Sequence, residues 1–79
     1  MDEIEQMVRQ VCAEALGRDD VGPTDDLVDA GLDSSLTIEV ITRLQMQYGV
    51  DVLDEFFVEP TVAHLARAIQ ERSLPSTEG

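Results

Sequence analysis

The sequence is poor in aromatic and basic residues. Its 79 residues include one Tyr, two Phe and no Trp, so a hydrophobic core must be built mainly from aliphatic side chains. Lys and Arg together number 5 against 17 Asp and Glu, which gives a formal net charge of −12 at pH 7. This excess of negative charge argues against nucleic acids and anionic membranes as partners, and it favours proteins with basic docking patches.

Cysteine and long hydrophobic runs are also scarce. Cys12 is the single cysteine, so no disulfide can form within the chain. We expect it to be a small core residue, because buried thiols are usually inert. No apolar run approaches the length of a membrane-spanning helix, and the acidic N-terminus lacks the pattern of a signal peptide. The sequence therefore predicts a cytoplasmic protein that does not contact membranes.

The hydrophobic content is that of a small folded domain. It reaches 43% of the chain, which is too high for a disordered sequence. A chain of this length forms one domain, which we assign to residues 1–73. The last residues, 74–79, contain Leu, Pro, Ser, Thr, Glu and Gly and are predicted to be a disordered tail.

Apolar residues recur at helical spacing in three segments. The spacing predicts helices over Glu3–Leu16, Ser34–Tyr48 and Val62–Ser73. Each of the first two is followed by a glycine, which commonly ends a helix. The last helix follows Thr61, a favourable N-cap residue.

The connecting segments complete an all-α fold. Residues 18–32 form a long loop, in which Leu27, Val28 and Leu32 are predicted to pin the chain onto the helices. Residues 49–53 are interpreted as an extended connector, because their strand-like alternation has no partner strand.

A short helix over residues 55–58 is expected after Asp54, which can cap it. Pro60 disfavours helix at the residue before it and so separates this helix from the last one. The sequence thus predicts a small four-helix bundle of three main helices and a short third helix, with a long loop between helices 1 and 2.

The most informative motif lies in the middle of the chain, at Gly31-Leu32-Asp33-Ser34. Asp33 is a good N-cap, because its carboxylate can accept backbone N–H groups of the first turn. Ser34 then falls at the start of the helix, where a phosphate would lie beside the positive end of the helix dipole. Ser35 points outward on a helical wheel more directly than Ser34, so geometry alone leaves both serines open.

The helix over 34–48 has two distinct faces. Its core face is predicted to contain Thr37, Val40, Ile41, Leu44 and Tyr48. The outer face includes Ile38 and Met46, and exposed apolar side chains of this kind suggest a docking surface. The predicted partner-docking residues are Ser35, Leu36, Ile38, Glu39, Thr42, Arg43 and Met46.

From about Ile4 to Ile69, these features resemble the acyl and peptidyl carrier protein family. The resemblance lies in four stretches, which are Leu16-Gly17, Gly31-Leu32-Asp33-Ser34, Ile38-Glu39-Val40-Ile41 and Phe56-Phe57-Val58-Glu59-Pro60-Thr61-Val62. They resemble the end of the family's first helix, its phosphopantetheine attachment motif, the core of its second helix and its Phe-x-x-Pro-Thr stretch. The last stretch is typical of peptidyl and polyketide carriers.

The resemblance implies a role without catalysis. A phosphopantetheinyl transferase would move 4'-phosphopantetheine from coenzyme A to a serine hydroxyl, and alignment on Asp33 and Glu39 selects Ser34. The arm would then hold an acyl or aminoacyl group as a thioester. Partner enzymes would dock around the second main helix: an adenylation or other acyl-loading enzyme, condensation or ketosynthase enzymes, and tailoring enzymes.

Two departures from the family pattern bear on the pathway. Ser35 stands where the family commonly has Leu or Ile. The second main helix holds only Glu39 as an acid, opposed by Arg43, whereas carriers of fatty acid synthesis often have a strongly acidic helix there. We therefore expect a discrete, monomeric carrier of nonribosomal peptide or polyketide biosynthesis. A fatty acid carrier, a D-alanyl carrier and a domain of a larger synthase stay open.

Two other classes of function compete with the carrier. An acidic helical interaction module without a prosthetic group would explain the charge, but it does not predict a serine at the helix start. A hydrolase using Ser34 and His64 would need an orienting acid and a substrate pocket. A calcium loop is disfavoured, because the third and sixth positions counted from Asp25 are Leu27 and Ala30.

Overall fold

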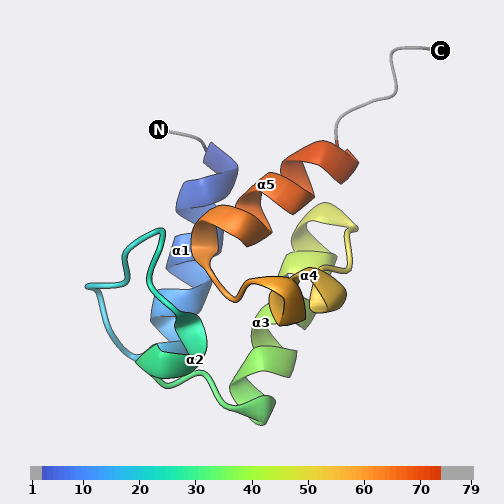
Figure 1. The fold of residues 1–79 in the computed structure, drawn as a ribbon. Helices are drawn as coiled ribbons and strands as arrows, with labels where there is room; N and C mark the ends of the chain where they lie inside the picture. Colours follow the sequence, from blue (N-terminus) through green and yellow to red (C-terminus); the bar gives the residue numbers. More distant parts are fainter. Residues whose placement is uncertain (1–2, 74–79) are drawn as a thin grey trace, which may run out of the picture.

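A computed structural model describes residues 3–73, and the predicted tail at 74–79 lies outside them. The described chain contains helices and no strands: α1 (Glu3–Leu16), α2 (Leu27–Ala30), α3 (Ser34–Tyr48), α4 (Leu53–Val58) and α5 (Val62–Ser73) (Figure 1). The predicted all-α fold and the bounds of the three main helices are confirmed. No helix in this range is long and apolar enough to cross a membrane.

The three long helices form the body of the molecule. α1 packs against both α3 and α5, and the short α4 packs against α5. The loop after α1 turns back through α2 and delivers the chain to the start of α3 (Figure 1). Between α1 and α3, Glu14 Oε1 accepts a hydrogen bond from Arg43 Nη2 at 2.9 Å.

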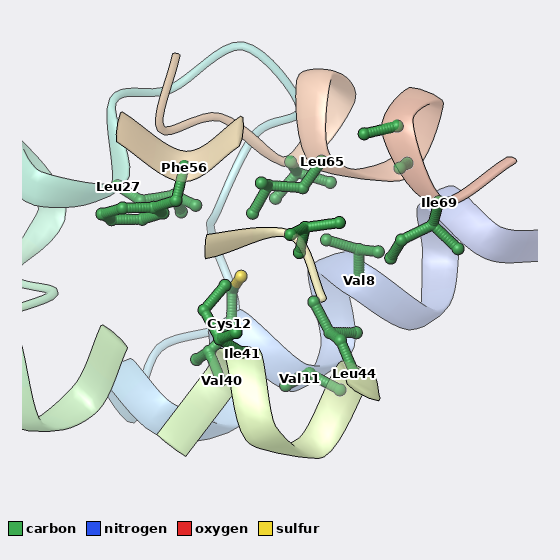
Figure 2. Packing of buried hydrophobic residues seen from close by; sticks show 14 of the residues in the cluster. Val8, Val11, Cys12, Leu27, Val40, Ile41, Leu44, Phe56, Leu65 and Ile69 are labelled. Atoms are coloured by element: carbon green, nitrogen blue, oxygen red, sulfur yellow. The ribbon is translucent and has the colours of Figure 1, made fainter. Parts of the chain in front are cut away.

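The core is aliphatic, as the composition predicts. Every helix contributes to it, with Val8 and Cys12 from α1, Leu27 from α2, Leu44 from α3, Phe56 from α4 and Leu65 from α5 (Figure 2). Burial raises the pKa of the Cys12 thiol to about 12, because the apolar surroundings disfavour a thiolate. Cys12 is therefore the protonated core residue that the sequence predicts.

The long loop contains a short helix that the sequence analysis does not predict. Asp26 caps α2, because its Oδ1 accepts hydrogen bonds from the backbone N–H groups of Val28 at 2.9 Å and Asp29 at 3.2 Å. Leu27 and Leu32 are buried as expected, but Val28 is 55% exposed, so the prediction that it pins the loop is wrong. Neighbouring residues of a helix project about 100° apart, and in this short helix Leu27 faces the core while Val28 faces outward.

The start of α4 also differs from the prediction. The helix begins at Leu53, and Asp54 lies within its first turn instead of capping it. The carboxylate that accepts the backbone N–H of Leu53 belongs to Asp51, at 3.0 Å. The connector before it is non-helical as predicted, with Val50 and Val52 buried. Burial of these two valines places α4 over the core.

Candidate functional site

Ser34 is the first residue of α3 and is exposed. The N-cap residue Asp33 has an extended backbone, and its Oδ1 accepts a hydrogen bond from the backbone N–H of Leu36 at 2.9 Å. The first backbone bond of the helix runs from Thr37 N to the Asp33 carbonyl at 2.8 Å. The earlier N–H groups of a helix have no partner within it. The Ser34 hydroxyl therefore lies at the positive end of the helix dipole, as the motif predicts.

A groove opens beside Ser34 between α3 and α4. Its volume is about 500 Å³. The side chains lining it are predominantly apolar, and they come from α2, from the two residues before α3, from α3 and from α4. The lining residues are Val28, Leu32, Asp33, Ser34, Thr37, Ile38, Leu53, Phe56 and Phe57.

Exposed apolar side chains form the rim of this groove. Val28, Ile38 and Phe57 line it, and their exposed fractions are 55%, 57% and 74%. The ring of Phe57 packs edge-on against the buried ring of Phe56, with centroids 6.0 Å apart. The sequence analysis does not identify the groove wall that α4 forms with Leu53, Phe56 and Phe57. The Phe-Phe pair is a weak signal at best, because successive residues of a six-residue helix project about 100° apart and only one of the two rings is buried.

The predicted docking residues of α3 differ in exposure and in what they contact. Ile38 lies on the groove side with Ser34. Leu36 is half-buried against the core, and Arg43 forms its ion pair with Glu14 of α1. That hydrogen bond from Arg43 lowers the pKa of Glu14. The remaining predicted residues, all of them exposed, are Ser35, Glu39, Thr42 and Met46.

The long loop is fastened near its two ends by Arg18. Its guanidinium forms two hydrogen bonds with the carboxylate of Asp20, both at 3.0 Å, and donates a third to the Ala30 carbonyl at 3.3 Å. The hydrogen bonds from Arg18 lower the pKa of Asp20, so its carboxylate stays ionised. Arg18 thereby joins the end of α1 to the end of α2, three residues before the N-cap of α3.

The histidine lies away from Ser34. The Nε2 atom of His64 is 2.9 Å from Glu55 Oε1, and these residues line a separate cavity of about 190 Å³ between α4 and α5. Ser34 is not part of this cavity. Within residues 3–73, the structure therefore does not bring together the serine and histidine that a hydrolase would need.

We expect Asp33→Ala to destabilise the domain by about 1 kcal/mol, because the N–H group of Leu36 loses its capping carboxylate. For a domain of this size, such a loss lowers the melting temperature by about 4–8 °C. Thermal unfolding followed by circular dichroism measures this shift.

Two variants serve as controls for the cap. Asp33→Asn keeps a capping side chain and is expected to melt close to the wild type. Asp29→Ala also removes one exposed carboxylate, but Asp29 makes no side-chain hydrogen bond within the described part of the chain. If Asp29→Ala lowers the melting temperature as much as Asp33→Ala does, the capping role is wrong.

The described helical bundle presents an exposed serine, Ser34, at the start of α3. Over residues 6–69, the chain matches the family described as "phosphopantetheine attachment site". The chain therefore belongs to this family of phosphopantetheine-binding carrier proteins, and its prosthetic group is 4'-phosphopantetheine.

Curated relatives include both small carriers and large synthases. The chain is 33% identical over 75 residues to an acyl carrier protein of Rickettsia typhi, covering 90% of this chain and 87% of the relative. It is 34% identical over 73 residues to chondramide synthase cmdD of Chondromyces crocatus and covers 91% of this chain. It is 32% identical over 77 residues to tyrocidine synthase 2 of Brevibacillus parabrevis, covering 98% of this chain. The chain spans only 2% of the length of each synthase.

Two solved structures have the same fold. The solution structure of an active-site mutant of a peptidyl carrier protein matches with a TM-score of 0.90 and 21% identity, covering 100% of this chain and 89% of that one. A structure of the phosphopantetheine transferase Sfp with coenzyme A and a peptidyl carrier protein contains a chain that matches with a TM-score of 0.86. That match has 22% identity and covers 91% of this chain and 95% of the other.

The α3 start fits the prosthetic group of the family. Ser34 offers an exposed alcohol oxygen for a phosphodiester bond, and the helix N-terminus favours the negative charge of a phosphate. The apolar groove beside Ser34 gives the rest of an attached arm a surface to contact.

Proposed function

We propose that this chain carries 4'-phosphopantetheine on Ser34 and presents a bound acyl or aminoacyl group to partner enzymes. The observation that carries the proposal is the position of Ser34, exposed as the first residue of α3 and directly after its N-cap Asp33. When attached, phosphopantetheine supplies a terminal thiol that holds such a group as a thioester.

The groove favours Ser34 over Ser35 as the attachment site. Both serines are exposed, but Ser34 lines the apolar groove and Ser35 projects about 100° further around α3. A group on Ser34 therefore leaves the helix beside the α4 wall. The neighbouring carboxylate of Asp33 is engaged by its Oδ1 in capping α3, so this proposal assigns removal of the hydroxyl proton to the transferase. Catalysis in this proposal belongs to the partners.

The partners are a phosphopantetheinyl transferase, an adenylation or other loading enzyme, and condensation, ketosynthase or tailoring enzymes. The groove rim of Val28, Ile38 and Phe57 offers them apolar contact area. Exposed acids of the neighbouring loop, among them Asp26 and Asp29, suit a basic rim on the partner.

A natural-product pathway is the favoured setting. Glu39 is the one acidic residue of α3, so the docking helix is nearly neutral overall and depends more on apolar contacts than on charge. The similarity to chondramide and tyrocidine synthases supports peptide or polyketide chemistry. A fatty acid carrier is the second candidate, because the chain covers 87% of the acyl carrier protein of Rickettsia typhi.

The function is tested by incubating the protein with coenzyme A and a broad-specificity phosphopantetheinyl transferase and measuring its intact mass. The proposal predicts the addition of one phosphopantetheine group. A folded protein with unchanged mass would contradict it and would favour an interaction module without a prosthetic group.

The docking surface is tested by placing a negative charge at each of two exposed apolar positions of α3, Ile38 and Met46. We expect Ile38→Glu and Met46→Glu to raise the KM of the transferase for the carrier by at least about fivefold, because a charge would be desolvated at an apolar contact. Steady-state kinetics at varied carrier concentration measure this change.

Gln47→Glu is the matched control. Gln47 is exposed on the same helix, about 180° from Ile38, and the substitution adds the same charge. Equal KM values for Ile38→Glu and Gln47→Glu would show that the groove side of α3 is not the docking surface.

A further inference from the structure

Glu55 lies on the side of α4 that faces away from the groove, and both of its carboxylate oxygens contact α5. Oε1 lies 2.9 Å from His64 Nε2, and Oε2 accepts a hydrogen bond from Arg72 Nη2 at 3.1 Å. Arg72 Nη1 also donates to the Asp51 carbonyl at 2.8 Å, just before α4 begins. The side chains of Glu55 and His64 are only 26% and 27% exposed, so water weakens these contacts less than those of an open surface pair.

α4 is otherwise held by a few local contacts, namely the buried side chains of Val52 and Phe56 and the hydrogen bond from Leu53 N–H to Asp51 Oδ1. It has six residues, which is too short for a helix that is stable alone. Its N-cap residue, Val52, makes no side-chain capping hydrogen bond, and Phe56 is the one buried residue within it. The helix packs against α5, where the Glu55 contacts lie. The Glu55 contacts therefore add to the buried contacts of Val52 and Phe56 in positioning α4.

The same short helix forms one wall of the groove beside Ser34. Leu53, Phe56 and Phe57 line the groove opposite Thr37 and Ile38 of α3. Glu55 is absent from this lining, and it projects about 200° around the helix from Phe57. Glu55 thus holds the side of α4 that faces away from the groove, and any shift of α4 moves Phe57 relative to Ser34.

We propose that Glu55, held by His64 and Arg72, is a positioning residue that sets the distance between the Phe57 wall and Ser34 and so controls how partner enzymes bind the carrier. The link to partner binding rests on the proposed function, whereas the effect on the groove does not. Glu55 touches neither Ser34 nor the groove, so it acts through the placement of α4.

The test compares Glu55→Gln and Arg72→Gln with the control Glu71→Gln. Glu71 forms an ion pair with Arg67 at 3.3 Å within α5, and both of these side chains are well exposed. All three variants remove one charge from an ion pair, but only the first two loosen α4. Arg72→Gln alters a partly exposed side chain and gives a second variant if Glu55→Gln does not fold.

Two readouts follow groove geometry and partner binding separately. In the unmodified protein, the NMR signals of Ile38 and Phe57 are expected to shift in Glu55→Gln and Arg72→Gln and to stay in place in Glu71→Gln. The KM of the transferase for the carrier is expected to rise about threefold to tenfold in the first two variants. Its kcat is expected to stay unchanged, because Ser34 and its cap are untouched.

A double variant tests whether Glu55 acts through the groove wall. In a Phe57→Ala background, Glu55→Gln is expected to raise KM little further, because the wall that it positions is already lost. Additive effects of the two substitutions, or a KM in Glu55→Gln equal to that in Glu71→Gln, would overturn the proposal. If the wild type itself is not modified, the proposed function fails, and the NMR comparison still decides whether Glu55 positions α4.

Discussion

Replacing Ser34 by alanine is expected to abolish modification by the transferase, under conditions that convert the wild type completely. Alanine lacks the hydroxyl oxygen that must form the phosphodiester bond, and no amount of enzyme can restore it. The fold should survive, because Ser34 is exposed and its hydroxyl makes no hydrogen bond within residues 3–73. Intact mass measures the modification, and circular dichroism measures the fold.

Ser35→Ala is the control for this experiment. Ser35 is the neighbouring exposed serine of the same helical turn, and its replacement is expected to leave the added mass unchanged. If Ser35→Ala loses the modification and Ser34→Ala keeps it, the function stands but the attachment site is wrong. If Ser34→Ala loses its helical signal, the loss of modification no longer identifies the site.

Replacing Leu44 by alanine is expected to destabilise the domain by about 2–5 kcal/mol, the range for truncating a buried leucine. Leu44 is fully buried in the core face of α3, so the substitution leaves a cavity (Figure 2). A domain of this size has roughly 4–12 kcal/mol of total stability, so the variant loses a large part of it. Urea unfolding measures the change as a lower midpoint.

Met46→Ala provides the matched comparison for Leu44. Met46 lies two residues further along α3 and is 82% exposed, so its truncation removes little buried surface. We expect its free energy of unfolding to stay within about 0.5 kcal/mol of the wild type. Equal losses of stability in the two variants would contradict the assignment of the core and outer faces of α3.

Local sequence signals predict the long helices and the place of Ser34 well. The helical spacing of apolar residues predicts the bounds of α1, α3 and α5, and short-range capping by Asp33 places Ser34 at the start of α3. Thr61 caps α5 as predicted, because its Oγ1 accepts the backbone N–H of His64 at 3.1 Å. These features depend on residues within one turn of each other, so they can be predicted without knowing the packing.

The groove, and the contacts of Glu55 with His64 and Arg72 behind it, depend on packing. They are therefore absent from the sequence analysis. The groove forms between α3 and α4, whose relative position depends on buried contacts with the rest of the bundle and on the contacts of Glu55 with α5. In the pairs Leu27-Val28 and Phe56-Phe57, the first residue is buried and the second is exposed. Packing decides which residue of each pair faces the core, and the sequence does not show it. Glu55 and Arg72 are 17 residues apart, a separation at which the sequence holds no sign of their contact.

The most direct measurement locates the modification within the wild-type protein. Trypsin cleaves after Arg18 and Arg43, and the peptide 19–43 contains Ser34 and Ser35 and no other serine. After incubation with coenzyme A and the transferase, tandem mass spectrometry of this peptide should place one phosphopantetheine group on Ser34. A group on Ser35, or an unmodified peptide from a folded protein, would contradict the assignment of Ser34 as the carrier residue.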